Sequence, residues 1–260
     1  MMHTITAVII AKDEEEMIGG CLSSLKFCDE ILLIDGRSTD KTREIAHSHG
    51  AKIIQYPSGD FSKSRNQALL HATGDWLLYV DADERVTKEL VVSIKSKLSL
   101  PHPHKAYRIK RKNFYFKKYE WPAIERLERL FQRESIKEWY GELHETAVIE
   151  GDVGDADGFL LHFSHRDLSS MLDKTLLWST VEAKNRFSAH HPQMTWWRFP
   201  RVMLTAFFRS FIGERGWQVG TAGLIESIYQ SYSAFVTYAK LWEMQHELKT
   251  QNAKLKVTRN

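Results

Sequence analysis

The sequence predicts an α/β fold in which helices flank a mostly parallel sheet, and three observations support this prediction. Short apolar runs of strand length alternate with segments of helical character, which is typical of a parallel sheet. Glycines and capping residues separate the two kinds of segment. One apolar run ends on two aspartates, Asp81 and Asp83, and sheets of this kind bind ligands at the carboxyl ends of their strands.

Strand and helix patterns alternate four times in the first hundred residues. Each strand is predicted by a short apolar run, and the fourth run leads directly to Asp81. The predicted strands are, in order, residues 4 to 11, 30 to 35, 51 to 55 and 74 to 84. Each helix is predicted by apolar residues at helical spacing or by capping residues before it and a terminating residue such as Gly74 after it. The predicted helices are, in order, residues 18 to 25, about 42 to 49, 62 to 72 and about 87 to 98.

The pattern changes after residue 100, where Pro101 and Pro103 interrupt the chain. Shorter strands follow, and from Leu168 onward helices dominate, with a long terminal helix expected over residues 229 to 249. The shorter strands include residues 105 to 116 and 129 to 133. The chain is therefore expected to divide into three parts, namely residues 1–100, 101–166 and 167–260.

Composition excludes several classes of protein. With 260 residues and 43% hydrophobic content, the chain can form one large α/β domain with an appendage. A formal net charge of +3 is too small to imply nucleic-acid binding, and Cys21 and Cys28 are too few for a disulfide scaffold. The apolar run at residues 7 to 11 stops at Lys12 and four acidic residues, so we expect no signal peptide and a cytoplasmic location. No run reaches the ~18 apolar residues of a membrane span.

Asp81 and Asp83 lie at the C-terminal end of the fourth predicted strand with one residue between them. A hard cation such as Mg²⁺ or Mn²⁺ takes oxygen ligands and is usually held by one or two carboxylates together with substrate phosphates. The position therefore suits a metal bound to a diphosphate. The same tripeptide recurs at residues 155 to 157, but glycines flank that copy, so we predict that it is a structural turn.

Carboxylates also follow the first two predicted strands. Asp35 could accept hydrogen bonds from a base or a ribose, and because Ser38 or Asp40 can cap the next helix, Asp35 is left for that role. Glu14 lies just past the first strand, where a carboxylate could bind a ligand or could simply favour the helix dipole.

Two sets of cations could bind anions. Lys63 and Arg65 lie at the start of a predicted helix, where a diphosphate could also meet the helix amides, although a solvated helix face is the alternative. Arg126, Arg129 and Arg133 could form a basic wall for an anionic acceptor, or they could be ordinary surface residues.

Glu142, His144 and Glu145 place two carboxylates and an imidazole within four residues. Either carboxylate could act as a general base on a hydroxyl, and periodicity alone does not choose between them. His162 follows an apolar strand. Most such histidines are structural, but a His162 that lies near Asp83 could complete a metal site.

Residues 196 to 212 predict a basic amphipathic helix. On a helix, three arginines and Thr205 share one stripe, and large apolar residues cover the remainder; the arginines are Arg198, Arg201 and Arg209. Two tryptophans precede the stripe. The segment is too short to cross a bilayer but suits an anionic membrane interface, and we favour this reading over that of a core-packing helix.

With these residues in view, the chain resembles the family 2 glycosyltransferases of the GT-A fold, specifically the group around lipopolysaccharide core β-1,4-glucosyltransferases. The resemblance covers most of the chain and rests on several motifs in a fixed order. The motifs are AKDEE at residues 11–15, IDGRSTDKT at 34–42, FSKSRNQA at 61–68, DADE at 81–84, RLF at 129–131 and HE at 144–145.

The resemblance implies an inverting transfer of a hexose, expected to be glucose, from a UDP-sugar to a lipid-linked or lipopolysaccharide core sugar. It implies that Glu14 and Asp35 face the nucleoside, Asp81 the ribose and Asp83 the Mg²⁺ or Mn²⁺ on the diphosphate, with Arg65 near the phosphates.

The resemblance also makes Glu145 the preferred base and matches His162 to a histidine that these proteins have after an apolar strand. Residues 1–100 would then bind the nucleotide sugar, residues 101–166 the acceptor, and residues 167–260 would form a helical extension at the inner face of the cytoplasmic membrane.

Three other functions stay open on sequence alone. A nucleotidyltransferase would usually carry a glycine-rich phosphate loop after the first strand, where this chain has Lys12 followed by acids. The sugar could instead pass to polyprenyl phosphate or to another surface glycan. A non-catalytic nucleotide-sugar or membrane-binding module would tolerate the loss of both Glu142 and Glu145.

Overall fold

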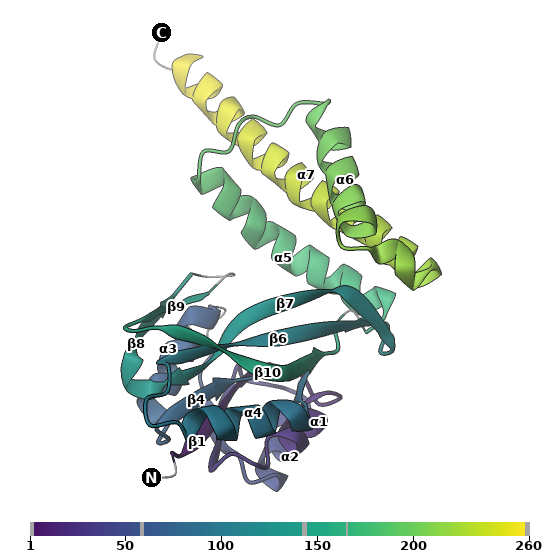
Figure 1. Cartoon of the computed structure of the whole chain (residues 1–260). Coiled ribbons are helices and arrows are strands. Elements are labelled where there is room, and N and C mark those ends of the chain that lie inside the picture. The colour runs from purple at the N-terminus through teal and green to yellow at the C-terminus, as the bar shows by residue number, and fades with distance from the viewer. Residues whose placement is uncertain (1–2, 58–59, 142–144, 165, 258–260) are drawn as a thin grey trace. The chain divides into compact units, whose positions relative to one another are not determined.

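Figure 1 shows a computed structural model of the chain, which describes residues 3–57, 60–141, 145–164 and 166–257. The chain forms two compact units. The first comprises the residues up to 113 together with 124–164, and the second comprises residues 114–123 together with the remainder of the chain from 165.

An eight-stranded sheet forms the centre of the first unit, with the spatial order β3-β2-β1-β4-β7-β6-β10-β5. The strands are β1 (Ile5–Ala11), β2 (Glu30–Asp35), β3 (Lys52–Gln55), β4 (Trp76–Tyr79), β5 (Glu84–Val86), β6 (Ala106–Tyr115), β7 (Tyr119–Gln132) and β10 (Val153–His162). Four neighbouring pairs are parallel, β1–β2, β1–β4, β2–β3 and β6–β10, whereas β4–β7 and β5–β10 are antiparallel. The predicted mostly parallel sheet is confirmed. A separate antiparallel pair joins β8 (Ile136–Tyr140) to β9 (Thr146–Ile149).

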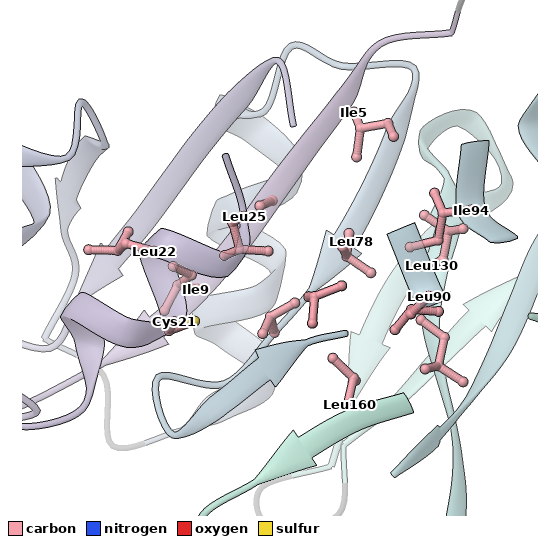
Figure 2. Packing of buried hydrophobic residues seen from close by; sticks show 14 of the residues in the cluster. Ile5, Ile9, Cys21, Leu22, Leu25, Leu78, Leu90, Ile94, Leu130 and Leu160 are labelled. Carbon is pink, nitrogen blue, oxygen red and sulfur yellow. The ribbon is translucent and has the colours of Figure 1, made fainter. Parts of the chain in front are cut away.

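Both faces of the sheet are covered. Helices α1 (Ile18–Ser24), α2 (Thr42–Ser48) and α4 (Lys88–Leu98) pack on one face, and α3 (Phe61–His71) packs with β8 on the other (Figure 1). In β4, Trp76 and Leu78 belong to the first hydrophobic cluster, whereas Leu77 and Tyr79 belong to the second. Figure 2 shows the first cluster, in which side chains of α1 and α4 meet those of the strands. Burial on both faces explains why the strands are continuous apolar runs.

The eight elements predicted in the first hundred residues are confirmed. Seven have ends within two residues of the prediction, whereas the fourth strand, β4, ends at Tyr79, five residues before its predicted end. Beyond residue 100 the sequence was less informative. Strand β7 begins at Tyr119, ten residues before the predicted strand, because charged residues such as Glu125 and Arg126 interrupt its apolar pattern. The short strand β5 directly after Asp83 carries a buried glutamate, and the apolar pattern does not predict it.

The predicted turn at residues 155 to 157 is wrong. These residues lie within β10, where Asp155 and Ala156 pair with β6 and the register shifts between Ala156 and Phe159. Gly158, with a φ of 93°, occupies this irregularity. Pairing with a neighbouring strand supplies the backbone hydrogen bonds that the local glycine and aspartate pattern would otherwise find in a turn.

The second unit is helical, as predicted. It contains α5 (Leu168–Ser188), α6 (Arg198–Phe208), a π-helical turn (Arg209–Gly213), a short 3₁₀ helix (Gly216–Val219) and α7 (Thr221–Val257). Thr175 of α5 and Tyr229 of α7 join their hydroxyls at 2.7 Å, and Ser231 of α7 donates to the carbonyl of Met203 in α6. Helix α7 begins eight residues before the predicted terminal helix. Within the described residues, no helix has both the length and the apolar character needed to cross a membrane.

We predict that Gly158→Ala destabilises the first unit more than Gly50→Ala does. Both glycines have positive φ, 93° and 77°, but a Cβ on Gly158 would clash with the backbone of Leu90, lying 2.6 Å from its Cα, whereas nothing lies within 4 Å of one on Gly50. Conformational strain costs about 1–2 kcal/mol at either site, and overpacking adds about 1–3 kcal/mol at Gly158. Urea unfolding of the two variants measures the difference, and equal losses of stability would contradict the close packing of α4 on β10.

Candidate functional site

The predicted acidic residues gather along one edge of the sheet. Strands β1, β2 and β4 are parallel, so the residues that follow them emerge at a common edge. Glu14 follows β1, Asp35 ends β2, and Asp81 and Asp83 follow β4. His162 ends β10 and is paired in register with residues of β5 and β6.

A cluster of buried charges lies under this edge. Asp81 Oδ2 accepts a hydrogen bond from Arg129 Nη2 at 2.6 Å, and Glu84 Oε2 accepts one from the backbone nitrogen of Asp81 at 3.0 Å. Glu84 Oε1 lies 3.1 Å from Arg111 Nη1 and 3.4 Å from Arg129 Nη2. Glu84 is fully buried and Arg129 is nearly so, and charges in such surroundings are tolerated only when they are paired.

The cluster fixes the ionisation of Asp81. Desolvation by burial works to raise the pKa of Asp81, but the charges of Arg129 and Arg65 outweigh it and hold this pKa well below its usual range. The side chain of Asp81 stays about one-third exposed, at 33%. The protein thus presents an ionised carboxylate at the edge of the sheet.

Arg65 of α3 connects Asp81 to Glu145. Its Nε and Nη2 donate to Glu145 Oε1 at 2.9 and 2.6 Å, and Nη2 lies 3.6 Å from Asp81 Oδ1. The guanidinium also lies 5.1 Å from the ring centre of Tyr79 and 4.8 Å from that of Trp139, which are cation–π distances. Three residues from distant parts of the sequence therefore meet, and Arg65 is not a solvated cation on a helix face.

Asn66 holds α3 against β8. Its Nδ2 donates to the carbonyl of Trp139 at 2.9 Å, and its Oδ1 accepts from the backbone nitrogen of Trp139 at 2.8 Å. The Trp139 indole in turn donates to the hydroxyl of Tyr79 at 3.2 Å. These bonds place Arg65 beside the rings of Tyr79 and Trp139.

Asp83 and His162 form a second pair on the same edge. Asn113 Nδ2 donates to Glu125 Oε1 at 3.2 Å, and because an ionised carboxylate only accepts, the amide must direct its Oδ1 towards His162 Nδ1, at 2.7 Å. Nδ1 therefore carries a hydrogen. In the neutral imidazole, Nε2 then offers a lone pair towards Asp83 Oδ2, which is 3.4 Å away.

This pair fits a divalent cation. Histidine ligands of metals usually donate their other ring N–H to an outer partner, which Asn113 provides here. Within the described part of the chain, no group of three or more histidine, cysteine, aspartate or glutamate side chains is arranged to hold a metal. Asp83 and His162 would thus share the ion with phosphate oxygens and water, as Mg²⁺ sites commonly do.

The acidic loops after β1 and β2 are bonded to each other. Asp35 is buried, and its carboxylate accepts from both the hydroxyl and the backbone nitrogen of Ser38, so the prediction that Asp35 is left free by the turn is wrong. The first helix begins at Ile18, and Glu14 precedes it, with its backbone nitrogen donating to the hydroxyl of Thr42 at 2.8 Å. Asp13 similarly accepts from the backbone nitrogen of Thr39 at 2.7 Å.

Several other candidates do not join this cluster. The Lys63 side chain is 67% exposed, and its ammonium lies 3.4 Å from Asp60. Glu142 and His144 lie outside the described residues. The prediction that Arg126, Arg129 and Arg133 form a basic wall is wrong, because the three side chains lie in different surroundings. Arg129 is buried with Asp81 and Glu84, Arg126 is 60% exposed beside Asp155, and Arg133 donates to the carbonyl of Ala72.

The local sequence pattern does not predict the residues that support the site. Glu84, Arg111 and Asn113 were not identified. Glu84 accepts from the backbone nitrogen of Asp81 and pairs with both Arg111 and Arg129, and Asn113 is hydrogen-bonded to His162. The role of Glu84 could nevertheless have been predicted from the sequence. It directly follows Asp81 and Asp83 at the end of an apolar run, and a glutamate buried at such a position is expected to pair with a cation. Arg111 and Asn113 lie in a strand with mixed polarity, and nothing in their local pattern distinguishes them.

Comparison with known proteins gives a consistent family match. The family model described as "Glycosyl transferase family 2" matches residues 6–146. The lipopolysaccharide core biosynthesis glycosyltransferase LpsC of Rhizobium meliloti (strain 1021) is 29% identical over 261 residues, which cover 95% of this chain and 94% of LpsC. An uncharacterized glycosyltransferase of Rickettsia typhi is 27% identical over 274 residues, which cover 96% and 90% of the two chains.

Among solved structures, mannosyl-3-phosphoglycerate synthase from Rubrobacter xylanophilus is 19% identical, with a TM-score of 0.46 over 74% of this chain and 77% of that chain.

We predict that Arg129→Met is strongly destabilising and that Arg126→Met is not. The first change leaves Asp81 and Glu84 without their shared buried cation, which typically costs about 3–5 kcal/mol. Arg126 lies on the same strand but is exposed, so its replacement should change stability by less than about 0.5 kcal/mol. Urea unfolding of the two variants checks this, and a small effect for Arg129→Met would show that the buried cluster contributes little.

Proposed function

The chain belongs to glycosyl transferase family 2, and on that premise we propose that it transfers a hexose, expected to be glucose, from a UDP-sugar to a lipid-linked or lipopolysaccharide core sugar hydroxyl. One observation carries the proposal: Arg65 joins Asp81, on the proposed donor side, to Glu145, the proposed base. The name of the relative LpsC supports a lipopolysaccharide core acceptor.

The donor would lie along the carboxyl edge of the sheet. Glu14 and Asp35 are the residues proposed to face the nucleoside, and Asp81 is proposed to accept a hydrogen bond from the ribose. Arg129 binds Asp81 Oδ2 at 2.6 Å but approaches Oδ1 only to 3.4 Å, so Oδ1 is the oxygen better placed to take a further donor. Lys63 and Arg65 are the cations proposed to meet the diphosphate.

The resident cation would be Mg²⁺ or Mn²⁺, held by Asp83 and His162. When bound, it would supply Lewis-acid stabilisation of the negative charge that develops on the departing diphosphate. Asn113 keeps the hydrogen of His162 on Nδ1 and so keeps Nε2 available to the metal, which makes Asn113 a positioning residue.

Glu145 is the proposed base. Its carboxylate would take the proton of the acceptor hydroxyl as the hydroxyl oxygen attacks the anomeric carbon, and the bond from that carbon to the diphosphate oxygen would break on the opposite side. The anomeric configuration therefore inverts. Arg65 now donates twice to Glu145 Oε1, and a diphosphate would compete for these N–H groups. Their transfer to the diphosphate would leave Glu145 ready to accept the hydroxyl proton.

Each of the three predicted parts of the chain is proposed to have its own role. Residues 1–100 would bind the donor, residues 101–166 the acceptor, and the helices from 167 would bring the protein to the inner face of the cytoplasmic membrane, where a lipid-linked acceptor is found. Transfer to polyprenyl phosphate or another surface glycan is the alternative within the same chemistry.

The donor site can be tested by calorimetric titration with UDP, GDP and CMP, with and without Mn²⁺. We expect metal-dependent binding of UDP that is lost in Asp83→Asn and weakened about tenfold or more in Asn113→Ala, because outer partners of metal ligands typically contribute that much. Asp157→Asn, an exposed aspartate on β10, is the matched control. A folded protein that binds none of the three nucleotides would refute the proposed donor site.

The catalytic step can be tested with Glu145→Gln, which keeps the size of the side chain but cannot take a proton. We expect kcat for sugar transfer to fall by about 10²–10⁴-fold while UDP still binds. Turnover should be followed from UDP-glucose to a lipopolysaccharide core acceptor. Unchanged transfer would reject Glu145 as the base, and UDP binding without transfer by the wild type to any lipid-linked acceptor would favour a non-catalytic nucleotide-sugar module.

A further inference from the structure

One exposed face of the second unit combines large apolar side chains with arginines. A shallow groove runs along α6 and the π-helical turn, lined chiefly by Arg201, Leu204, Phe208, Arg209 and Ile212. We call these five residues the α6 face. Leu204, Phe208 and Ile212 are 54–56% exposed, and none of the residues of α6 is buried. A helix that served only to pack a core would bury its apolar stripe.

The opposite side of this segment is fixed to α7. Ser210 is buried and its hydroxyl lies 3.0 Å from that of Ser227, and the Met203 carbonyl accepts from Ser231 at 3.0 Å. The hydrogen bonds thus hold one side of the segment against α7 and leave the α6 face pointing away from it. The π-helical turn lies within this segment, and such turns often occur at functional sites.

The charge of this region is positive. Residues 196 to 217 contain four arginines and one glutamate, a net charge of +3. Arg201 has no carboxylate within ion-pair distance among the described residues, and Arg209 is 80% exposed, with its Nε 3.4 Å from Glu214. Tryptophans flank the segment, with Trp196 83% exposed and Trp217 54% exposed. Tryptophan and arginine beside exposed apolar residues are the composition of interfacial helices.

We propose that the α6 face docks on an anionic phospholipid bilayer, with Leu204, Phe208 and Ile212 entering the boundary of the acyl chains and Arg201 and Arg209 paired with lipid phosphates. The charges favour this occupant over a second copy of the chain. A twofold dimer through this face would bring arginines of one copy close to arginines of the other.

This inference locates the surface behind the proposed membrane association and does not require that the protein transfer a sugar. Failure of vesicle binding and failure of nucleotide binding are separate outcomes, because the α6 face belongs to the second unit and the proposed donor residues belong to the first.

The test is flotation of the 260-residue chain with vesicles of phosphatidylcholine alone or of phosphatidylcholine mixed with phosphatidylglycerol. We expect binding to the anionic vesicles that weakens with salt. The double variant Arg201→Glu and Arg209→Glu should reduce partitioning about tenfold or more, since each arginine near such a surface contributes substantially. The double variant Lys26→Glu and Lys88→Glu makes the same change in net charge at exposed residues of the first unit, and it should bind like the wild type.

A third variant, Leu204→Ser with Phe208→Ser, should remove the part of the binding that persists at high salt. UDP titration of each variant shows whether the first unit is intact. Equal loss of binding in the two charge-reversal variants, or equal binding to neutral and anionic vesicles, would overturn the proposal. So would a concentration-dependent dimer that Arg201→Glu and Arg209→Glu abolish without affecting vesicle binding, since the face would then be a contact between copies.

Discussion

The buried ion pairs around Arg129 are the constraint on which the proposed site depends. Glu84 is fully buried and must be compensated, and Arg129 provides the compensation while also binding Asp81. Through Asp81 the same network reaches Arg65 and then Glu145. The two carboxylates proposed for donor binding and for proton transfer are therefore held by arginines that cannot move independently of the core. Such preorganisation is the kind that catalysis by fixed charges needs.

The sheet register brings the second part of the site together. Strand β10 runs parallel to β6 and antiparallel to β5, which places His162 beside Asn113 and opposite Glu84. The residue just before β5 is Asp83, so one proposed metal ligand and the buried Glu84 are neighbours in the chain. Asn113 also donates a hydrogen bond to Glu125. This bond orients the Asn113 amide, and the amide oxygen in turn orients the imidazole of His162.

The two units have different roles in the proposed function. The family match covers residues 6–146, which lie almost wholly in the first unit and include both Asp83, a proposed metal ligand, and Glu145, the proposed base. The long helices lie outside that range, and the features that distinguish them are exposed tryptophans, arginines and large apolar side chains. The proposed chemistry on a sheet edge, joined to a helical unit that is proposed to bind a membrane, is consistent with function being carried by sites and surfaces rather than by the fold as a whole.

The sequence by itself determined the strand and helix order of the first hundred residues, because burial on both faces makes each strand a continuous apolar run. It also identified Asp81, Asp83, Arg65, Glu145 and His162 as candidates, since short motifs show which chemistry a position can support. Apart from the pairing of His162 with Asp83, it did not reveal their partners. Arg111 and Asn113 come from a strand of mixed polarity, and Asp35 was judged from its neighbours without the bonds to Ser38. The bonds between Asp35 and Ser38 are local, but the residue types alone did not show which side chain the turn would use. Only the tertiary structure decided the contacts of Arg111 with Glu84 and of Asn113 with His162, because they join residues tens of positions apart, and local patterns carry no information about register.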